Sequence, residues 1–534
     1  MRPRRHAAPS RDESGESLFG SEKHRNEREA KALEHGKELH EAGEYEELVK
    51  YYESLPPADV TPRIVADLAR AYANLAVERR AQTDEFDLRS KDLLDYAISL
   101  MESVVGYFGE DDPQVNYFIG KSYLMLDLPS KALPYVRRYK QAKPDDEEAS
   151  QLLAYCETSL AAPFSITPFV KRAKAAWEKF SKNEAEIRAL LDWRRDNEAY
   201  YLAEDSLFDG AEFMLAQLPM QGRCQLILSP LHWRPDLYKL VLFKSMAPAS
   251  VLEHWEILLG WQVCDNADFD TGNRIVYAED VVCWPEYYED DGTVFLKVYS
   301  KPLAKERERD SELAYKAATS LVDETVGEIV SMQCVDGLEV LPSPLDSKSM
   351  TLFELREAIA EKLAPIHEGR LGSEEACLAQ EFCFSKAPTG NKSAQMGDRS
   401  DAVIGSSTCP ELIDDYNDGY TDSVDVALED GVVEGYFYWP HGQLADTDIA
   451  EGLVFELSED VEDAIAARAP EGVVSFIGAS YGTQCSYLDF IAWDFPALMQ
   501  TAREVFADFP IIDCAAFRAF RPGAPSFAVK GSYK

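Results

Sequence analysis

The sequence predicts a multidomain α+β protein, in which an all-α helical solenoid precedes two α+β units with largely antiparallel sheets. Three observations predict this class. Apolar residues recur at helical spacing in the first part of the chain, and short alternating runs bounded by turn residues dominate the rest. The chain is also long enough, at 534 residues with 46% hydrophobic, to bury more than one core.

The composition is strongly acidic. The chain carries 54 Lys and Arg against 95 Asp and Glu, a formal net charge of -41. Such a surface repels nucleic acid and anionic membranes, and no apolar run reaches the length of a spanning helix. The basic start lacks the apolar stretch of a secretory signal. We therefore expect a cytoplasmic protein whose partner is a protein or peptide, with no nucleic acid and no membrane.

Ten cysteines are scattered without any C-x-x-C pair, which predicts reduced, mostly buried thiols. The sequence also contains no H-E-x-x-H, no phosphate-binding loop and no dinucleotide fingerprint. We expect no cofactor and no metal.

Residues 1–26 are polar and aperiodic, which predicts a disordered tail, and residues 27–160 read as a helical repeat domain. Its best-defined unit has small or bulky residues at Ile119, Gly120, Tyr123, Ala132, Val136, Tyr139 and Pro144. Two helices can approach closely where Gly120 faces Ala132, and Pro144 ends the second helix.

These offsets resemble the tetratricopeptide repeat, whose period is about 34 residues. Two looser units precede this one, and residues 145–161 supply a capping helix. The resemblance implies a solenoid with a groove lined by the first helix of each unit. A generic array of helical hairpins is the alternative.

Polar residues, several of them basic, fall on those first helices. The candidate groove residues are Lys37, Arg63, Arg70, Asn74, Tyr117 and Lys121. In so acidic a chain this stripe favours a clamp for an acidic or carboxylate-ending peptide. The alternative is a set of ordinary solvated positions.

Residues 161–345 read as a helical hairpin plus an α+β domain, because two prolines in 161–168 break the array and the spacing then changes. We expect helices at 170–193, 197–218, 250–262 and 311–330, and strands at 224–230, 238–245, 274–288, 293–300 and 328–333. A linker helix follows within residues 346–375.

Residues 376–534 read as a second α+β domain. We expect strands at 380–386, 432–440, 473–477, 486–494 and 514–520, and helices within 410–431, 458–469 and 496–508. Stretches such as VLEHWEILLG and YLDFIAWD resemble uncharacterised regions attached to tetratricopeptide repeats in bacterial proteins. That resemblance implies architecture and no chemistry.

Gly478, Ser480 and Gly482 have the spacing G-x-S-x-G of a hydrolase nucleophile turn. The residues that follow predict a strand instead of a helix, with Tyr481 and Gly482 in a hairpin turn. The eight histidines end at His441, before the serine, whereas the hydrolase order places the histidine after it. The sequence therefore predicts no catalytic residue.

Two acidic stretches carry tyrosines, residues 284–292 and 414–422. The second has Asp and Gly at calcium-loop spacing over residues 414–425, but Tyr416 takes the third ligand position and an Asp takes the twelfth, which disfavours a metal site. Aromatic rings beside carboxylates can anchor a basic protein. The candidate contact surface is Tyr287, Tyr288, Asp290, Asp414, Tyr416 and Tyr420. Tyrosines packed at strand ends are the alternative.

The function predicted from the sequence is that of a non-enzymatic adaptor, with one partner in the repeat groove and a second on the acidic C-terminal units. The first alternative is a neutralising, immunity-like protein that covers a basic enzyme or toxin. The second is a hydrolase that uses Ser480, which the sequence disfavours.

Overall fold

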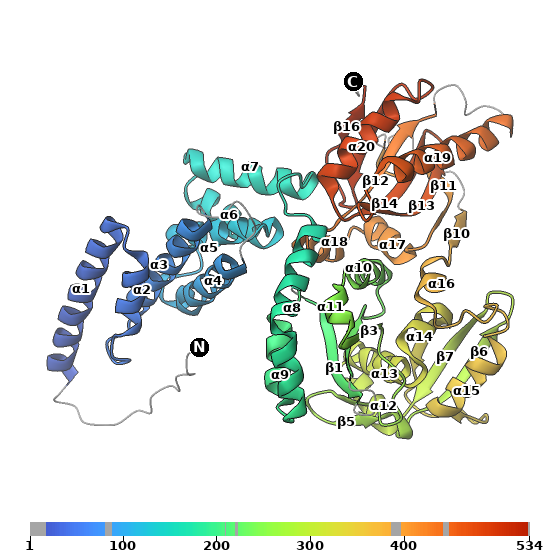
Figure 1. Cartoon of the computed structure of the whole chain (residues 1–534), viewed down its shortest axis with the longest axis horizontal. Helices are drawn as coiled ribbons and strands as arrows, with labels where there is room; N and C mark the ends of the chain where they lie inside the picture. The colour runs from blue at the N-terminus through green and yellow to red at the C-terminus, as the bar shows by residue number, and fades with distance from the viewer. Residues whose placement is uncertain are drawn as a thin grey trace. The chain divides into compact units, whose positions relative to one another are not determined.

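The computed structural model describes residues 18–80, 88–208, 210–218, 223–385, 397–441 and 448–531. The chain forms two compact units, Met1–Leu160 and Ala161–Lys534, within a mixed α/β architecture (Figure 1). None of the helices in the described part of the chain combines the length and apolar character that a membrane span requires. Residues 1–17 of the predicted tail lie outside the described residues.

The described part of the first unit consists of helices. They are α1 (Leu18–Ala42), α2 (Tyr45–Glu53), α3 (Pro62–Arg80), α4 (Leu88–Phe108), α5 (Pro113–Met125), α6 (Pro129–Ala142) and α7 (Glu147–Ala161). The predicted disorder is wrong for residues 18–26, which belong to α1. A helix that has nucleated downstream extends at low cost through residues that tolerate its geometry.

Consecutive helices of this unit pack in pairs, and glycine permits their close approach. A Cβ at Gly120 on α5 would lie 2.9 Å from Val136 Cγ2 on α6. The nearest side chain is thus Val136 and not the predicted Ala132, which is nevertheless fully buried. A Cβ at Gly36 on α1 would likewise collide with the Tyr52 hydroxyl on α2. Any larger residue at these glycines would push its helix pair apart.

The second unit opens with two helices and a three-stranded sheet of order β1-β2-β3. The elements are α8 (Phe169–Asp192), α9 (Asp196–Glu204), β1 (Glu212–Leu218), β2 (Arg223–Ser229), α10 (Arg234–Ser245), α11 (Ala249–Leu252) and β3 (Trp255–Leu259). Strand β2 is antiparallel to β1 and parallel to β3, with α10 in the crossover.

Three predictions in this region are wrong. The strand predicted at 238–245 lies in helix α10, whose buried Leu237, Leu240 and Phe243 follow helical spacing. The long helix predicted at 197–218 is α9 followed by β1, and the helix predicted at 250–262 contains β3. Short apolar runs fit both element types, and here the parallel pairing of β2 with β3 decides the outcome.

A four-stranded sheet of order β8-β7-β6-β9 comes next. Its region contains β4 (Asp268–Asp270), β5 (Ile275–Tyr277), β6 (Val282–Tyr288), β7 (Thr293–Tyr299), α12 (Lys301–Arg309), α13 (Ser311–Val326), α14 (Glu328–Cys334), β8 (Val335–Val340), β9 (Met350–Thr351), α15 (Leu352–Lys362) and α16 (Glu374–Leu378). The predicted hairpin is present as β6 and β7. The strand predicted at 328–333 is helix α14, because Gly327, at φ +94°, ends α13 and lets a new helix begin.

The C-terminal region forms a seven-stranded sheet of order β10-β11-β13-β14-β12-β15-β16, antiparallel throughout. Its elements are β10 (Phe382–Ser385), β11 (Ala402–Ser407), α17 (Pro410–Asp418), α18 (Asp422–Glu429), β12 (Val433–Pro440), α19 (Asp448–Arg468), β13 (Val474–Gly482), β14 (Cys485–Ala492), α20 (Phe495–Ala507), β15 (Ala515–Ala519) and β16 (Phe527–Lys530). Every residue of β14 is buried, which explains its continuous apolar and aromatic character.

One hydrophobic core joins the first and last regions of the second unit. Trp177 of α8 and Phe243 of α10 belong to the same core cluster as Tyr436 of β12 and Tyr487 of β14. The predicted domain boundaries at residues 345 and 375 therefore do not separate compact units. Such long-range packing has no signature in local sequence spacing.

Candidate functional site

The predicted groove residues lie on three alternate helices of the first unit. Lys37 is on α1, Arg63, Arg70 and Asn74 are on α3, and Tyr117 and Lys121 are on α5. Lys37, Arg70 and Lys121 have exposed side chains, at 74%, 43% and 46%. Each of these three cations has a carboxylate neighbour, so the stripe is not an uncompensated positive surface.

Part of this stripe forms a chain of contacts that we name the polar strip: Arg70, Gln114, Tyr117, Lys121 and Glu148. Arg70 on α3 donates to Gln114 Oε1 on α5 at 3.4 Å. Tyr117 and Lys121 on α5 both donate to Glu148 Oε1 on α7, at 2.6 and 3.1 Å. Those two hydrogen bonds lower the pKa of Glu148. The polar strip therefore crosses three alternate helices.

Two residues of the predicted acidic and aromatic contact surface are not freely exposed. Tyr416 is buried, and its hydroxyl lies 3.1 Å from that of Tyr436 in the core, so this residue cannot contact a partner. Tyr287 is half-buried beneath Lys362, whose Nζ lies 4.0 Å from the ring centroid. Both rings belong to elements whose apolar face packs inward.

The other members of that surface remain accessible. Tyr288 and Tyr420 are 43% and 61% exposed, and Asp290 and Asp414 are exposed. The stretch with calcium-loop spacing folds as helices α17 and α18, and Asp425 pairs with Arg521. In the described residues, no group of three or more His, Cys, Asp or Glu is arranged to hold a metal ion.

Ser480 lies inside strand β13 and is fully buried, and its hydroxyl has no hydrogen-bond partner among the described residues. The strand continues to Gly482, so the turn predicted at Tyr481 and Gly482 is wrong. The chain turns after Gly482, and the positive φ of +147° belongs to Gly478, where the strand register shifts. A serine held this way cannot meet a substrate.

A different serine in the same hairpin meets a histidine. Ser486 Oγ lies 3.2 Å from His441 Nδ1, while His441 Nε2 lies 3.2 Å from the Gly482 carbonyl oxygen. The carbonyl needs a donor, so Nε2 carries the hydrogen and Nδ1 accepts from the serine. Burial lowers the pKa of His441, in agreement with a neutral ring. Ser486 is fully buried, so this pair closes a turn and does not face solvent.

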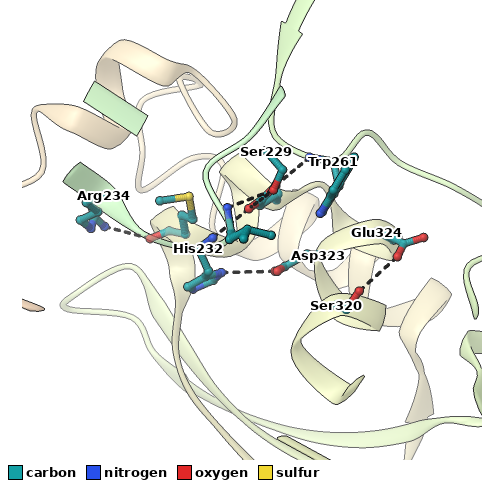
Figure 2. A network of polar contacts seen from close by, with 10 residues as sticks. Ser229, His232, Arg234, Trp261, Ser320, Asp323 and Glu324 are labelled. Carbon is teal, nitrogen blue, oxygen red and sulfur yellow. Dashed lines mark hydrogen bonds and ion pairs between the residues drawn. The ribbon is translucent and has the colours of Figure 1, made fainter. Parts of the chain in front are cut away.

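A cluster of polar side chains that the sequence did not predict lies where the parallel strands β2 and β3 end (Figure 2). This is the edge at which α/β sheets commonly bind ligands. His232 Nδ1 lies 3.4 Å from Asp323 Oδ1 on α13, and its side chain is 34% exposed. Burial disfavours the charged ring, but Asp323 outweighs burial and raises the pKa of His232. Leu231 and His232 both have positive φ, at +49° and +61°.

Glu328 holds this strained turn in place. Its buried carboxylate accepts hydrogen bonds from Ser229 Oγ, from the His232 amide at 2.9 Å and from the Trp261 amide at 2.8 Å. Burial raises the pKa of Glu328. The carboxylate thus occupies the backbone donors that would otherwise be available to an anionic ligand at these strand ends. Sequence reasoning missed this group because Asp323 and Glu328 lie far from His232 in the chain.

A pocket of about 340 Å³ lies between β10 and α17. Its wall includes Phe382 and Phe384 from the strand and Ile413, Asp414 and Asn417 from the helix. Comparisons of the chain with family models, with curated proteins and with solved structures find no match. The function must therefore be inferred from these residues.

Proposed function

We propose that the protein is a non-enzymatic adaptor whose first unit, a tetratricopeptide-like solenoid, binds an acidic or carboxylate-ending segment of a partner protein. The observation that carries this proposal is the polar strip. Two donors on α5, Tyr117 and Lys121, converge on the single carboxylate of Glu148 on α7. That is the arrangement needed to receive a carboxylate from another chain.

Exchange of Glu148 for a partner carboxylate explains how such a site can work in an acidic chain. Lys121 and Tyr117 are already oriented by Glu148, so little side-chain freedom is lost on binding. A partner carboxylate would accept the same two hydrogen bonds, and Glu148, itself about half exposed, would turn to solvent. Arg70 supplies a second cation one helix away.

The second unit would contact another protein through its acidic surface. Exposed Tyr288 and Tyr420 beside Asp290 and Asp414 favour a basic partner. The same residues support the alternative of an immunity-like protein that neutralises a basic enzyme or toxin. A basic partner held mainly by charge is released as the salt concentration rises.

The absence of an enzymatic role is also part of the proposal. Ser480 and Ser486 are fully buried, and the carboxylate of Glu328 is saturated by internal donors. The side chain of His232 is 34% exposed, and Ser229, three residues before it, donates to Glu328. These contacts favour structural roles for residues that resemble catalytic ones.

The test is affinity capture with the full chain, followed by mass spectrometry. Wild type, Lys121→Glu and Lys50→Glu are compared. Lys50 is a matched control, because it lies in the same unit on α2, is 59% exposed and also neighbours carboxylates. We expect one partner to be retained by wild type and Lys50→Glu and lost by Lys121→Glu. Equal capture by all three proteins would contradict the proposal.

A further inference from the structure

The pocket between β10 and α17 has one wall from each element. The helix contributes Pro410, Ile413, Asp414 and Asn417, which recur at the spacing of a single helix face. The strand contributes its whole length, including the rings of Phe382 and Phe384. A volume of about 340 Å³ falls at the lower end of small-molecule pockets, which span roughly 300–1,000 Å³.

Among the described lining residues of this pocket, Arg399 and Asp414 are charged, and only one of them is free to pair with a ligand. The guanidinium of Arg399 is buried, pairs with Asp489 and lies over the rings of Tyr436 and Tyr487. The carboxylate of Asp414 is exposed, and partial desolvation together with the carboxylates of Asp418 and Asp415 raises its pKa. Among the described lining residues, the charge available to a ligand is therefore negative.

We propose that this pocket binds a small organic amine in its ammonium form. The nitrogen would lie against the carboxylate of Asp414, with the side-chain oxygen of Asn417 as a second acceptor. An apolar or aromatic body would lie between Phe382, Phe384 and Ile413, whose surfaces it removes from water. The guanidinium of Arg234 already lies over the Phe382 ring, 4.8 Å from its centroid, so the ring that can attract the ligand cation is that of Phe384.

The charge of the chain supports this ligand over an anion. With a net charge of -41, the protein attracts cations and repels carboxylates and phosphates. A lysine side chain of another protein has the same chemistry, and we assign the site to a free amine because the cavity is small. This site belongs to the second unit and shares no residue with the polar strip, so it stands or fails independently of the proposed adaptor function.

The experiment uses a thiol that belongs to the pocket wall. Cys383 lines the pocket and is exposed, whereas the other nine cysteines are buried or half-buried. The rate of Cys383 alkylation by iodoacetamide is followed by mass spectrometry of the full chain. It is measured alone and with phenethylamine, 2-phenylethanol, phenylacetate or a lysine-containing peptide. Asp414→Asn is the test variant, and Asp422→Asn, on α18 and outside the pocket wall, is the control.

We expect phenethylamine to slow alkylation of Cys383, with 2-phenylethanol and phenylacetate at least about tenfold less effective. Asp414→Asn should weaken protection by phenethylamine about tenfold, and Asp422→Asn should leave it unchanged. Absence of protection, equal protection by phenylacetate, or unaltered protection in Asp414→Asn would overturn the assignment. Protection by the lysine peptide alone would also overturn it and identify a protein-docking site.

Discussion

The two units use polar side chains differently. In the helical array, the contacts of the polar strip are exposed and join residues up to 44 apart, as between Arg70 and Gln114. In the second unit, some ion pairs are buried and join still more distant segments. Lys239 and Asp430 are separated by 191 residues, and Arg399 and Asp489 by 90.

The exposed contacts of the array can be exchanged for contacts with a partner, whereas the buried ion pairs of the second unit must stay intact. An exposed pair in the array can be exchanged for a partner's group at little cost, because water solvates either charge when the pair opens. A buried charge that loses its partner in the second unit has no such alternative. The array is therefore suited to reversible binding, and the second unit to a fixed arrangement of its sheets.

The largest expected effect comes from breaking a buried pair. Arg399→Met leaves Asp489 buried without its cation and should lower the free energy of unfolding by about 3–5 kcal/mol. The double variant Arg399→Met/Asp489→Leu should recover much of this loss, because neither charge remains. Urea denaturation measures both. Equal losses in the single and double variants would show that the pair is not coupled.

The stability of the protein should depend on pH because of Glu434 on β12. Burial raises the pKa of Glu434 to about 8, and one of its oxygens has no partner among the described residues. The folded chain keeps a proton that the unfolded chain releases above its pKa of about 4.5, so stability falls as pH rises between these values. Glu434→Gln should remove this loss, gaining about 4 kcal/mol relative to wild type near pH 8. Urea denaturation of wild type and Glu434→Gln between about pH 4.5 and pH 8 measures this effect. If the free energy of unfolding changes with pH in the same way in both proteins, the prediction is contradicted.

Packing within the array can be tested with two glycines. Gly120→Ala places a Cβ against Val136 and should cost about 1 kcal/mol. Gly106→Ala, on α4, meets no atom within 4 Å and should stabilise its helix by about 0.5–1 kcal/mol. Amide hydrogen exchange in α4 and α5 would show whether each substitution lowers or raises the stability of its helix. Stabilisation by both substitutions would show that α5 and α6 are not closely packed.

The smallest effect concerns His232. Its pKa is raised by Asp323, so the folded state favours the charged ring. The resulting stability is fully present below the unfolded pKa of about 6.5 and is lost as pH rises through the folded value. His232→Gln should cost at most about 1 kcal/mol at acidic pH, because the side chain is partly exposed. A cost that persists at alkaline pH would point to packing instead.

Local spacing was sufficient to predict several elements. The helix at 352–362 carries a capping box at Thr351 and Glu354, and the β6–β7 hairpin alternates with period two. Local spacing failed at α10 and α14, where tertiary pairing decided between helix and strand. Part of the polar strip could be predicted from the sequence, because helical spacing places Tyr117 and Lys121 on the same face of one helix. The acceptor Glu148 could not be predicted, because it comes from α7, after the α5–α6 pair.

The most direct test of the adaptor proposal is the dissociation constant of the captured partner for the full chain. It is measured by calorimetry for wild type, Lys121→Glu and Lys50→Glu, after thermal melts have shown that all three fold alike. We predict that Lys121→Glu weakens binding by at least about tenfold, because a carboxylate replaces the central donor of the polar strip. A dissociation constant unchanged by Lys121→Glu would contradict the account.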